Sequence, residues 1–104
     1  MKTLNEKIVN FFSALADETR LLILISISKN SKRVGEIHKF VKKESKREIT
    51  LSAISHQLKL LKNSDIIKSE KKGREKHYSL SGDFCWCMLK DAVNHFKIKG
   101  GRKK

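Results

Sequence analysis

The sequence predicts a single, mainly α-helical domain that carries one small β-hairpin. Apolar residues recur at helical spacing in five segments of the 104-residue chain. The pattern changes to that of two short strands only between residues 66 and 80, on either side of a turn that contains Gly73. The length suits one modest core, so we predict one domain over residues 1–98 and a basic, flexible tail over residues 99–104.

Two helices are expected near the N-terminus. Over residues 4–15 the apolar side chains fall on one face, which is made of Leu4, Ile8, Phe11, Phe12 and Leu15. Asp17 is a suitable N-cap for a second helix at about residues 18–28. The run from Leu21 to Ile27 makes this second helix apolar nearly all round, so we expect it at the centre of the domain.

A third helix is predicted from Val34 to about Lys43, and its inward residues are Ile37, Phe40 and Val41. His38 is expected at the surface or the core boundary, because no second type of metal ligand stands three or four residues away. A charged connector, residues 42–48, leads into the next helix.

The helix over residues 50–62 has an unusual outer face. Ile54, Leu58 and Leu61 form its apolar stripe, and no acidic residue occurs in the whole stretch. The outer face offers small hydroxyls, an imidazole, an amide and two cations, which suit the base edges and phosphates of a duplex. The same composition also fits an ordinary basic amphipathic helix.

A hairpin with a cationic tip follows a turn at residues 63–65. We predict strands at Ile66–Glu70 and Glu75–Leu80, with Gly73 supplying a positive φ between them. Its basic residues are Lys71, Lys72, Arg74 and Lys76. His77 is expected to be structural or to face phosphate, and a final helix is expected over residues 83–97.

The charge balance favours a polyanionic partner. The chain has 24 Lys and Arg against 11 Asp and Glu, a net charge of +13, and residues 31–80 hold 14 of these bases and 6 of the acids. No secretory signal is recognisable, and the longest apolar run, Leu21–Ile27, is too short to cross a bilayer. We therefore expect a soluble, cytoplasmic protein without a membrane partner.

A polar-faced helix followed directly by a basic hairpin is the order of a winged helix-turn-helix. In that arrangement the recognition helix lies in the major groove, and the hairpin, or wing, reaches the neighbouring backbone or minor groove. We expect bases to be contacted by Ser52, Ser55, His56 and Gln57. Thr50 lies near the helix start, Ala53 allows close approach, and Lys59, Lys62 and the wing cations contact phosphates.

The motifs resemble the ArsR/SmtB family of winged-helix repressors over nearly the whole chain. The stretches that carry the resemblance are Ala14–Leu24 with its Leu-x-Asp-x-x-Arg pattern, Val34–Ile37, Ser52–Lys62 with its Ser-x-x-Ser-His-x-Leu pattern, Gly73–Arg74 and Tyr78–Leu80. The resemblance implies a homodimer, joined by its first and last helices, that binds an imperfect inverted repeat and blocks transcription.

Dimerisation is also expected from the residues themselves, because the apolar faces of the first and last helices exceed what one small core can bury. The predicted interface residues are Leu4, Ile8, Phe11, Phe84, Met88 and His95. The two recognition helices would then lie roughly 34 Å apart, to enter successive major grooves.

Two departures from the family pattern concern the connector and the effector. The connector is about six residues longer than is usual, within Lys42 to Ile49, and either adds phosphate contacts or is a solvated loop. Arg33 stands where one type of family metal site has cysteine, and the other type falls on Gly82, Phe84, His95 and Ile98. Only His95 of these four suits a metal, so no metal site or cofactor is predicted.

Cys85, Cys87 and His95 are the remaining effector candidates. Cys85 and Cys87 lie two apart in a predicted helix, where geometry opposes a disulfide between them, so reduced thiols are expected. Cys87 and His95 lie about 80° apart on a helix. Three roles stay open, namely buried apolar cysteines, thiol redox sensing and metal sensing.

Two other classes of function compete with a repressor. An architectural, weakly specific nucleoid-type DNA-binding protein would also use surplus positive charge and a basic tail. An enzyme is not predicted, because the sequence offers no nucleophile with an adjacent base, no paired carboxylates and no phosphate-binding glycine loop.

Overall fold

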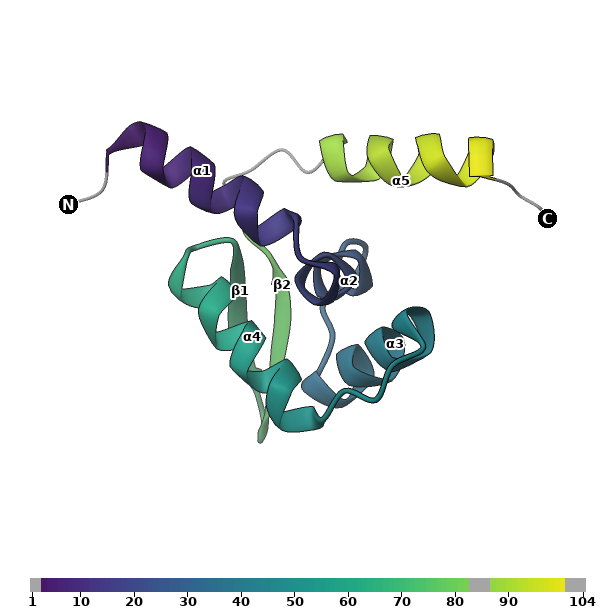
Figure 1. Ribbon diagram of the computed structural model, residues 1–104. Helices are drawn as coiled ribbons and strands as arrows, with labels where there is room; N and C mark the ends of the chain where they lie inside the picture. The colour runs from purple at the N-terminus through teal and green to yellow at the C-terminus, as the bar shows by residue number, and fades with distance from the viewer. Residues whose placement is uncertain (1–2, 83–86, 101–104) are drawn as a thin grey trace.

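The computed structural model has five helices and a two-stranded antiparallel hairpin, as the sequence predicts (Figure 1). It describes residues 3–82 and 87–100, with side chains up to residue 96. The elements in chain order are α1 (Leu4–Leu15), α2 (Glu18–Ser26), α3 (Val34–Ser45), α4 (Leu51–Asn63), β1 (Ile67–Lys72), β2 (Glu75–Leu80) and α5 (Cys87–Gly100).

Local capping sets the helix ends. Thr3 and Glu6 form a reciprocal capping box at the start of α1. The Asp17 carboxylate accepts a hydrogen bond from the Arg20 backbone N–H at 3.0 Å, which confirms Asp17 as the N-cap of α2. At the end of α4, Asp65 adopts φ 60°, and the next N–H, of Ile66, donates to the Leu61 carbonyl at 3.1 Å.

Three helix boundaries differ from those predicted. α2 ends at Ser26 rather than at residue 28. The Lys32 ammonium donates a hydrogen bond to the Ser26 carbonyl at this end of the helix. α3 continues to Ser45 and is closed by Lys46 in the left-handed region, with φ 58°. α5 is described from Cys87 to Gly100, so it extends beyond the predicted helix end at residue 97, whereas its predicted start at residue 83 lies outside the described residues.

The core lies where α2, α3 and α4 meet the base of the hairpin. Its fully buried side chains are Ile23, Leu24, Ile37, Val41, Ile54, Leu58, Leu61 and Ile66. Ile54, Leu58 and Leu61 belong to one face of α4, so their burial leaves the opposite face of this helix toward solvent.

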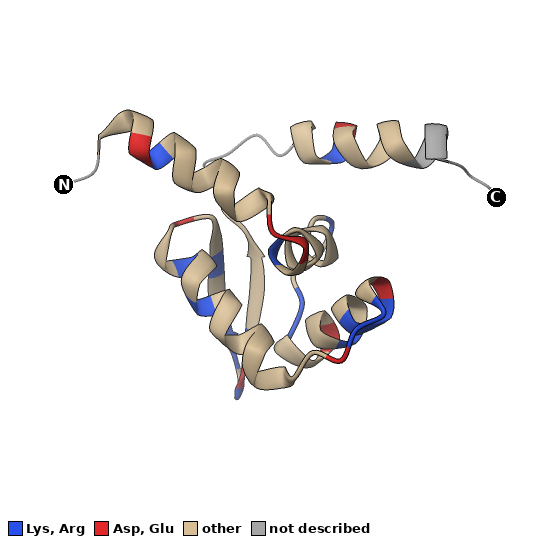
Figure 2. Cartoon of the chain, viewed as in Figure 1, with Lys and Arg blue, Asp and Glu red and all other residues tan. Residues whose placement is uncertain are grey.

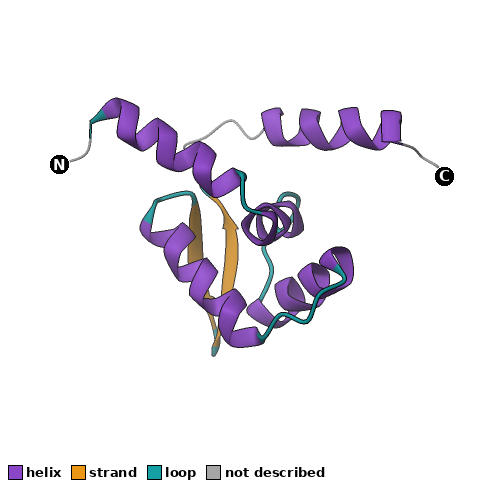
Figure 3. Cartoon of the chain, in the orientation of Figure 1, coloured by secondary structure: helices purple, strands orange, loops and turns teal. Residues whose placement is uncertain are grey.

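The elements divide the molecule into two ends. α1 and α5 lie along one end, whereas α3, α4 and the tip of the hairpin lie at the other (Figures 1 and 3). Within the described residues, no helix has the length and apolar character needed to cross a bilayer.

Candidate nucleic-acid interface

Most side chains of the predicted recognition surface are exposed on one face of α4. Thr50 caps the helix, because its hydroxyl oxygen accepts a hydrogen bond from the Ala53 N–H at 3.0 Å. The residues of the predicted set that are exposed on α4 are Ser52, Ala53, Ser55, His56, Lys59 and Lys62. In Figure 2, α4 carries basic segments and no acidic one.

Two exposed leucines on α4 were missed by the sequence reasoning. Leu51 is 46% exposed and Leu60 is 39% exposed, and both lie outside the buried stripe of Ile54, Leu58 and Leu61. Their exposure gives the α4 surface an apolar component beside its hydroxyls and cations. Apolar side chains of this kind suit contact with a thymine methyl group.

Gln57 is placed differently from the other predicted base-contact residues. It is half-buried, and its side-chain oxygen accepts a hydrogen bond from Arg20 Nε of α2 at 2.8 Å. The two residues are 37 positions apart in the chain, so the local spacing of residues does not predict this contact.

The wing is a tight hairpin with a basic tip. Lys72 pairs with Glu75, which leaves Gly73 and Arg74 as a two-residue turn, and Gly73 has φ 65°. The predicted contact residues Lys71, Lys72, Arg74 and Lys76 are all exposed. Lys71 lies directly opposite Lys76 in the antiparallel register. Like charges at this spacing are unfavourable in the free protein, and a polyanion would relieve the repulsion.

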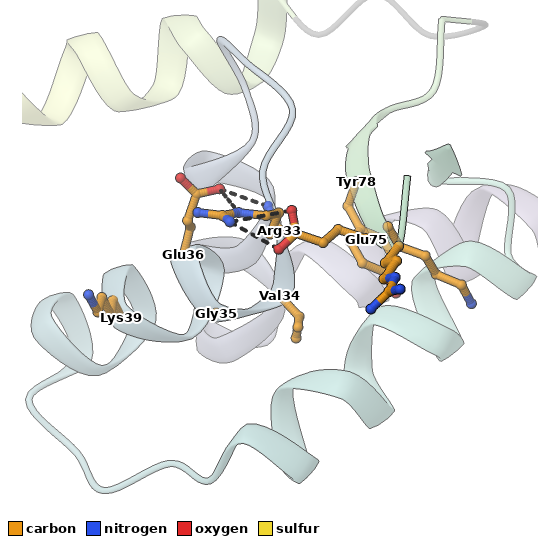
Figure 4. A pocket seen from close by; sticks show the side chains of 9 residues that line it. Arg33, Val34, Gly35, Glu36, Lys39, Glu75 and Tyr78 are labelled. Carbon is orange, nitrogen blue, oxygen red and sulfur yellow. Dashed lines mark hydrogen bonds and ion pairs between the residues drawn. The ribbon is translucent and has the colours of Figure 1, made fainter. Parts of the chain in front are cut away.

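Arg33 joins the wing to the start of α3. Its guanidinium contacts Glu75 at 3.1 Å and Glu36 at 3.4 Å, as the dashed lines in Figure 4 show. Lys32 and Tyr78 exchange two backbone hydrogen bonds, of 3.0 and 2.8 Å, so the loop before α3 also pairs with β2. A pocket of about 550 Å³ lies between these elements. Arg33 therefore holds the carboxylate of Glu75 next to the cations of the hairpin tip. The hydrogen bond with Glu75 raises the pKa of Arg33 above its ordinary value.

The Arg33 backbone N–H donates to the Glu36 carboxylate at 2.9 Å, and this bond holds the pKa of Glu36 below its ordinary value of 4.5. A carboxyl whose pKa is lowered in the folded state stabilises the fold above its unfolded pKa, and this stabilisation is lost as pH falls through the folded pKa. Glu36→Gln keeps the capping oxygen but does not titrate there. We expect the difference in unfolding free energy between wild type and Glu36→Gln to be constant near neutral pH and to change below about pH 4.5. Urea unfolding at a series of pH values measures it, and parallel curves down to pH 3 would contradict the expectation.

The long connector is attached at two points. The Arg47 guanidinium contacts Glu18 at 3.2 Å and the Thr19 hydroxyl at 3.1 Å, both in the first turn of α2. Nε2 of the half-buried His38 hydrogen-bonds the Ile49 carbonyl. Residues 42–45 of the connector are helical, as the end of α3, and contacts of Arg47 and Ile49 tie the remainder to α2 and α3. Arg47 thus makes contacts within the protein, and it is exposed, as are Lys42, Lys43 and Lys46.

The apolar faces predicted for dimerisation are only partly where expected. On α1, Leu4 is 72% exposed and Ile8 45%, but Phe11 is half-buried against the core and Phe12 is 54% exposed in its place. On α5, Met88 is 38% exposed and Phe96 70%. His95 is exposed and meets the ring of Phe96 edge-on, with 4.7 Å between centroids. Phe84 lies outside the described residues.

The effector candidates are incompletely described. Cys85 lies outside the described residues, whereas Cys87 is the first residue of α5 and is disulfide-bonded. The expectation of a reduced thiol at Cys87 is therefore wrong. That expectation rested on a helix running through both cysteines, and Cys85 lies outside the described residues. Within residues 3–82 and 87–96, no three side chains of His, Cys, Asp or Glu gather as metal ligands.

Two curated relatives share most of the chain. The chain is 31% identical over 85 residues to the transcriptional repressor SdpR of Bacillus subtilis, which covers 82% of this chain and 83% of that protein. It is 27% identical over 92 residues to the transcriptional repressor SmtB homolog of a Synechocystis species. The second match covers 88% of this chain but 65% of the relative, so the chain spans slightly less than two thirds of that protein.

Comparison with solved structures shows a shared fold. The DNA-binding domain of Mb0332 from Mycobacterium bovis matches with a TM-score of 0.74 at 18% identity, over 97% of this chain and 90% of that one. That domain is described as a homodimeric winged helix-turn-helix of a possible ArsR-family transcriptional regulator. No protein-family model matches the chain. The identity to SdpR over most of both chains, joined to the shared fold, shows that the chain belongs to the ArsR/SmtB family of winged helix-turn-helix transcriptional regulators.

Proposed function

We propose that this protein is a sequence-specific transcriptional repressor that binds an inverted-repeat DNA operator as a homodimer. The observation that carries the proposal is the acid-free outer face of α4, which is exposed because Ile54, Leu58 and Leu61 are fully buried on the opposite face. The repressor names of SdpR and of the SmtB homolog support the same function. The protein would act without catalysis, in the cytoplasm.

The exposed side chains divide into two groups by the part of DNA that they suit. Ser52, Ser55 and His56 offer hydrogen-bonding groups to base edges, and Ala53 lets the backbone approach the groove. The cations Lys59 and Lys62 on α4, and Lys71, Lys72, Arg74 and Lys76 on the wing, suit phosphates. The phosphate contacts would set the register and most of the affinity, and α4 would set the specificity.

The homodimer is supported by the apolar surface at the end of the molecule away from the wing. Leu4, Ile8 and Phe12 of α1 and Phe96 of α5 are each at least 45% exposed. Several large exposed apolar side chains at one end of a small molecule are typical of an interface. The winged helix-turn-helix domain of Mb0332, which has the same fold, is a homodimer. We propose that α1 and α5 pair with the same elements of a second copy, and that Phe12 takes the place first given to Phe11.

The two groups of contacts make different predictions on mutation. His56→Ala is expected to narrow the free-energy gap between operator and random DNA by about 1–3 kcal/mol, because a base contact is lost. Arg74→Ala is expected to weaken operator and random DNA about equally, because a phosphate contact carries no sequence information. Fluorescence anisotropy with both duplexes, at one moderate salt concentration, measures the two effects. Equal loss on both duplexes for His56→Ala would remove His56 from the base-reading set.

The test of the function itself is selection of bound duplexes from a random pool. A repressor of this kind would enrich a palindrome, and repeating the selection with reductant, oxidant or Zn²⁺ would identify an effector by loss of enrichment. The competing architectural function is favoured by the net charge of +13 and by the facing Lys71–Lys76 pair. It predicts no enriched sequence, no protected footprint and binding that falls steeply with salt.

A further inference from the structure

Arg20 of α2 and Gln57 of α4 form a specific link between the two helices. Arg20 Nε donates to the Gln57 side-chain oxygen at 2.8 Å, and both residues are half-buried. The backbone of Arg20 is itself fixed, because its N–H donates to the capping carboxylate of Asp17 at 3.0 Å. The donor in this link is therefore held by a capped helix start, and the acceptor lies on the helix that presents the recognition surface.

The position of Gln57 on α4 differs from that of the base-facing residues. At about 100° per residue, Gln57 lies about 60° from the buried Ile54, whereas His56 lies about 160° from it. An amide that reads adenine uses its oxygen and its NH₂ group together. The oxygen of Gln57 is already engaged by Arg20, so base reading by Gln57 would require the link to open.

The same turn of α2 also holds the chain that enters α4. Arg47 contacts Glu18 and Thr19 at 3.2 and 3.1 Å, and three residues later Thr50 caps α4. The first turn of α2 thus contacts the recognition helix at Gln57 and the connector at Arg47. A recognition surface keeps a defined geometry only when neighbouring side chains hold its helix in place by packing and hydrogen bonds.

We propose that Gln57 is a positioning residue, and that the first turn of α2, through Arg20, sets the angle at which α4 is presented to DNA. The inference rests on the proposed function and refines it. Base discrimination then belongs to Ser52, Ser55 and His56, and Gln57 leaves the predicted base-reading set. Arg20, the arginine of the Leu-x-Asp-x-x-Arg pattern, then contributes to DNA recognition without contacting DNA.

The link itself is tested by a double-mutant cycle of urea unfolding with Arg20→Ala, Gln57→Ala and the double variant. We expect the effects to be non-additive, with a coupling that changes the unfolding equilibrium constant about 2- to 10-fold. Gln57→Glu retains the acceptor and is expected to keep the coupling with Arg20. Additive effects of the two alanine substitutions would overturn the inference.

The role in recognition is tested by measuring base preference across single-base-pair variants of the selected operator. We expect Arg20→Ala and Gln57→Ala to weaken operator binding by similar factors, about 3- to 10-fold, without changing the preferred base at any position. Gln57→Glu lacks the NH₂ donor needed to read adenine, and it is expected to keep the same preferred bases with weaker binding to all duplexes. His56→Ala serves as the matched control on the neighbouring position, because it is expected to flatten the preference at its own base pair.

A change of preferred base in the Gln57 variants that Arg20→Ala does not reproduce would overturn the inference while leaving the repressor function intact. Absence of any base preference in the unmutated protein would instead reject the proposed function, and this inference with it. The two failures are therefore distinguishable in one set of measurements.

Discussion

Phe12→Glu is expected to convert the proposed dimer into a monomer and to weaken operator binding by about 100-fold or more. Phe12 is 54% exposed on the same face of α1 as Leu4 and Ile8, so a carboxylate there would be buried without a partner if two copies paired. A monomer engages one half-site at a time and loses the effective-concentration gain of a linked second half-site, which is typically 10²–10⁴-fold. Light scattering gives the oligomeric state, and operator titration gives the affinity.

Ser13→Glu is the matched control for this experiment. Ser13 is exposed on α1 about 100° round the helix from Phe12, so it receives the same charge outside the apolar face. We expect this variant to remain dimeric and to bind the operator nearly as the wild type does. A Phe12→Glu protein that stays dimeric at low micromolar concentration would exclude α1 from the interface.

Leu58→Ala is expected to lower the free energy of unfolding by about 2–5 kcal/mol. Leu58 is fully buried where α4 packs against the core, and truncation leaves a cavity that the surrounding helices fill only in part. Because the whole of a small domain's stability is about 5–15 kcal/mol, this loss would be a large share of the total. Urea unfolding at fixed protein concentration measures the change, since a dimer's apparent stability depends on concentration.

Leu60→Ala is the matched control on the same helix. Leu60 is 39% exposed, so the same substitution two residues away removes little buried surface, and we expect a change in unfolding free energy within about 1 kcal/mol. Similar losses for Leu58→Ala and Leu60→Ala would mean that α4 is not seated on the core by its Ile54, Leu58 and Leu61 face. The comparison thus separates the packing that holds α4 on the core from the exposed side chains of the recognition surface.

Much of the architecture was readable from local sequence patterns. Asp17 before an apolar run predicted the start of α2, and Gly73 between two strands predicted the wing. The two-residue turn was not predicted, because the strands pair as far as Lys72 and Glu75, where four residues had been expected between them. The buried stripe of Ile54, Leu58 and Leu61 gave the orientation of α4, and with it the exposed polar face. These features depend on residues a few positions apart, which is the range over which helical and strand periodicity operate.

Other features were decided by contacts between distant parts of the chain. Phe11 and Phe12 are neighbours in one apolar stripe, and only the packing of α1 on the core made Phe11 half-buried and left Phe12 exposed. The sequence predicts the charged connector as a solvated loop or a phosphate-binding segment, and it gives no indication of the Arg47–Glu18 ion pair that joins the connector to α2. No local rule distinguishes these alternatives.

The sequence by itself determined the order of helices and strands, the basic wing and the acid-free face of α4, because each depends on local spacing and composition. Only the tertiary structure decided that Gln57 is held by Arg20 and that Glu75 is held by Arg33. Those pairs are 37 and 42 positions apart in the chain, and a hydrogen bond or ion pair over such a separation depends on how the helices pack. Packing thus decides which polar side chains remain available to DNA.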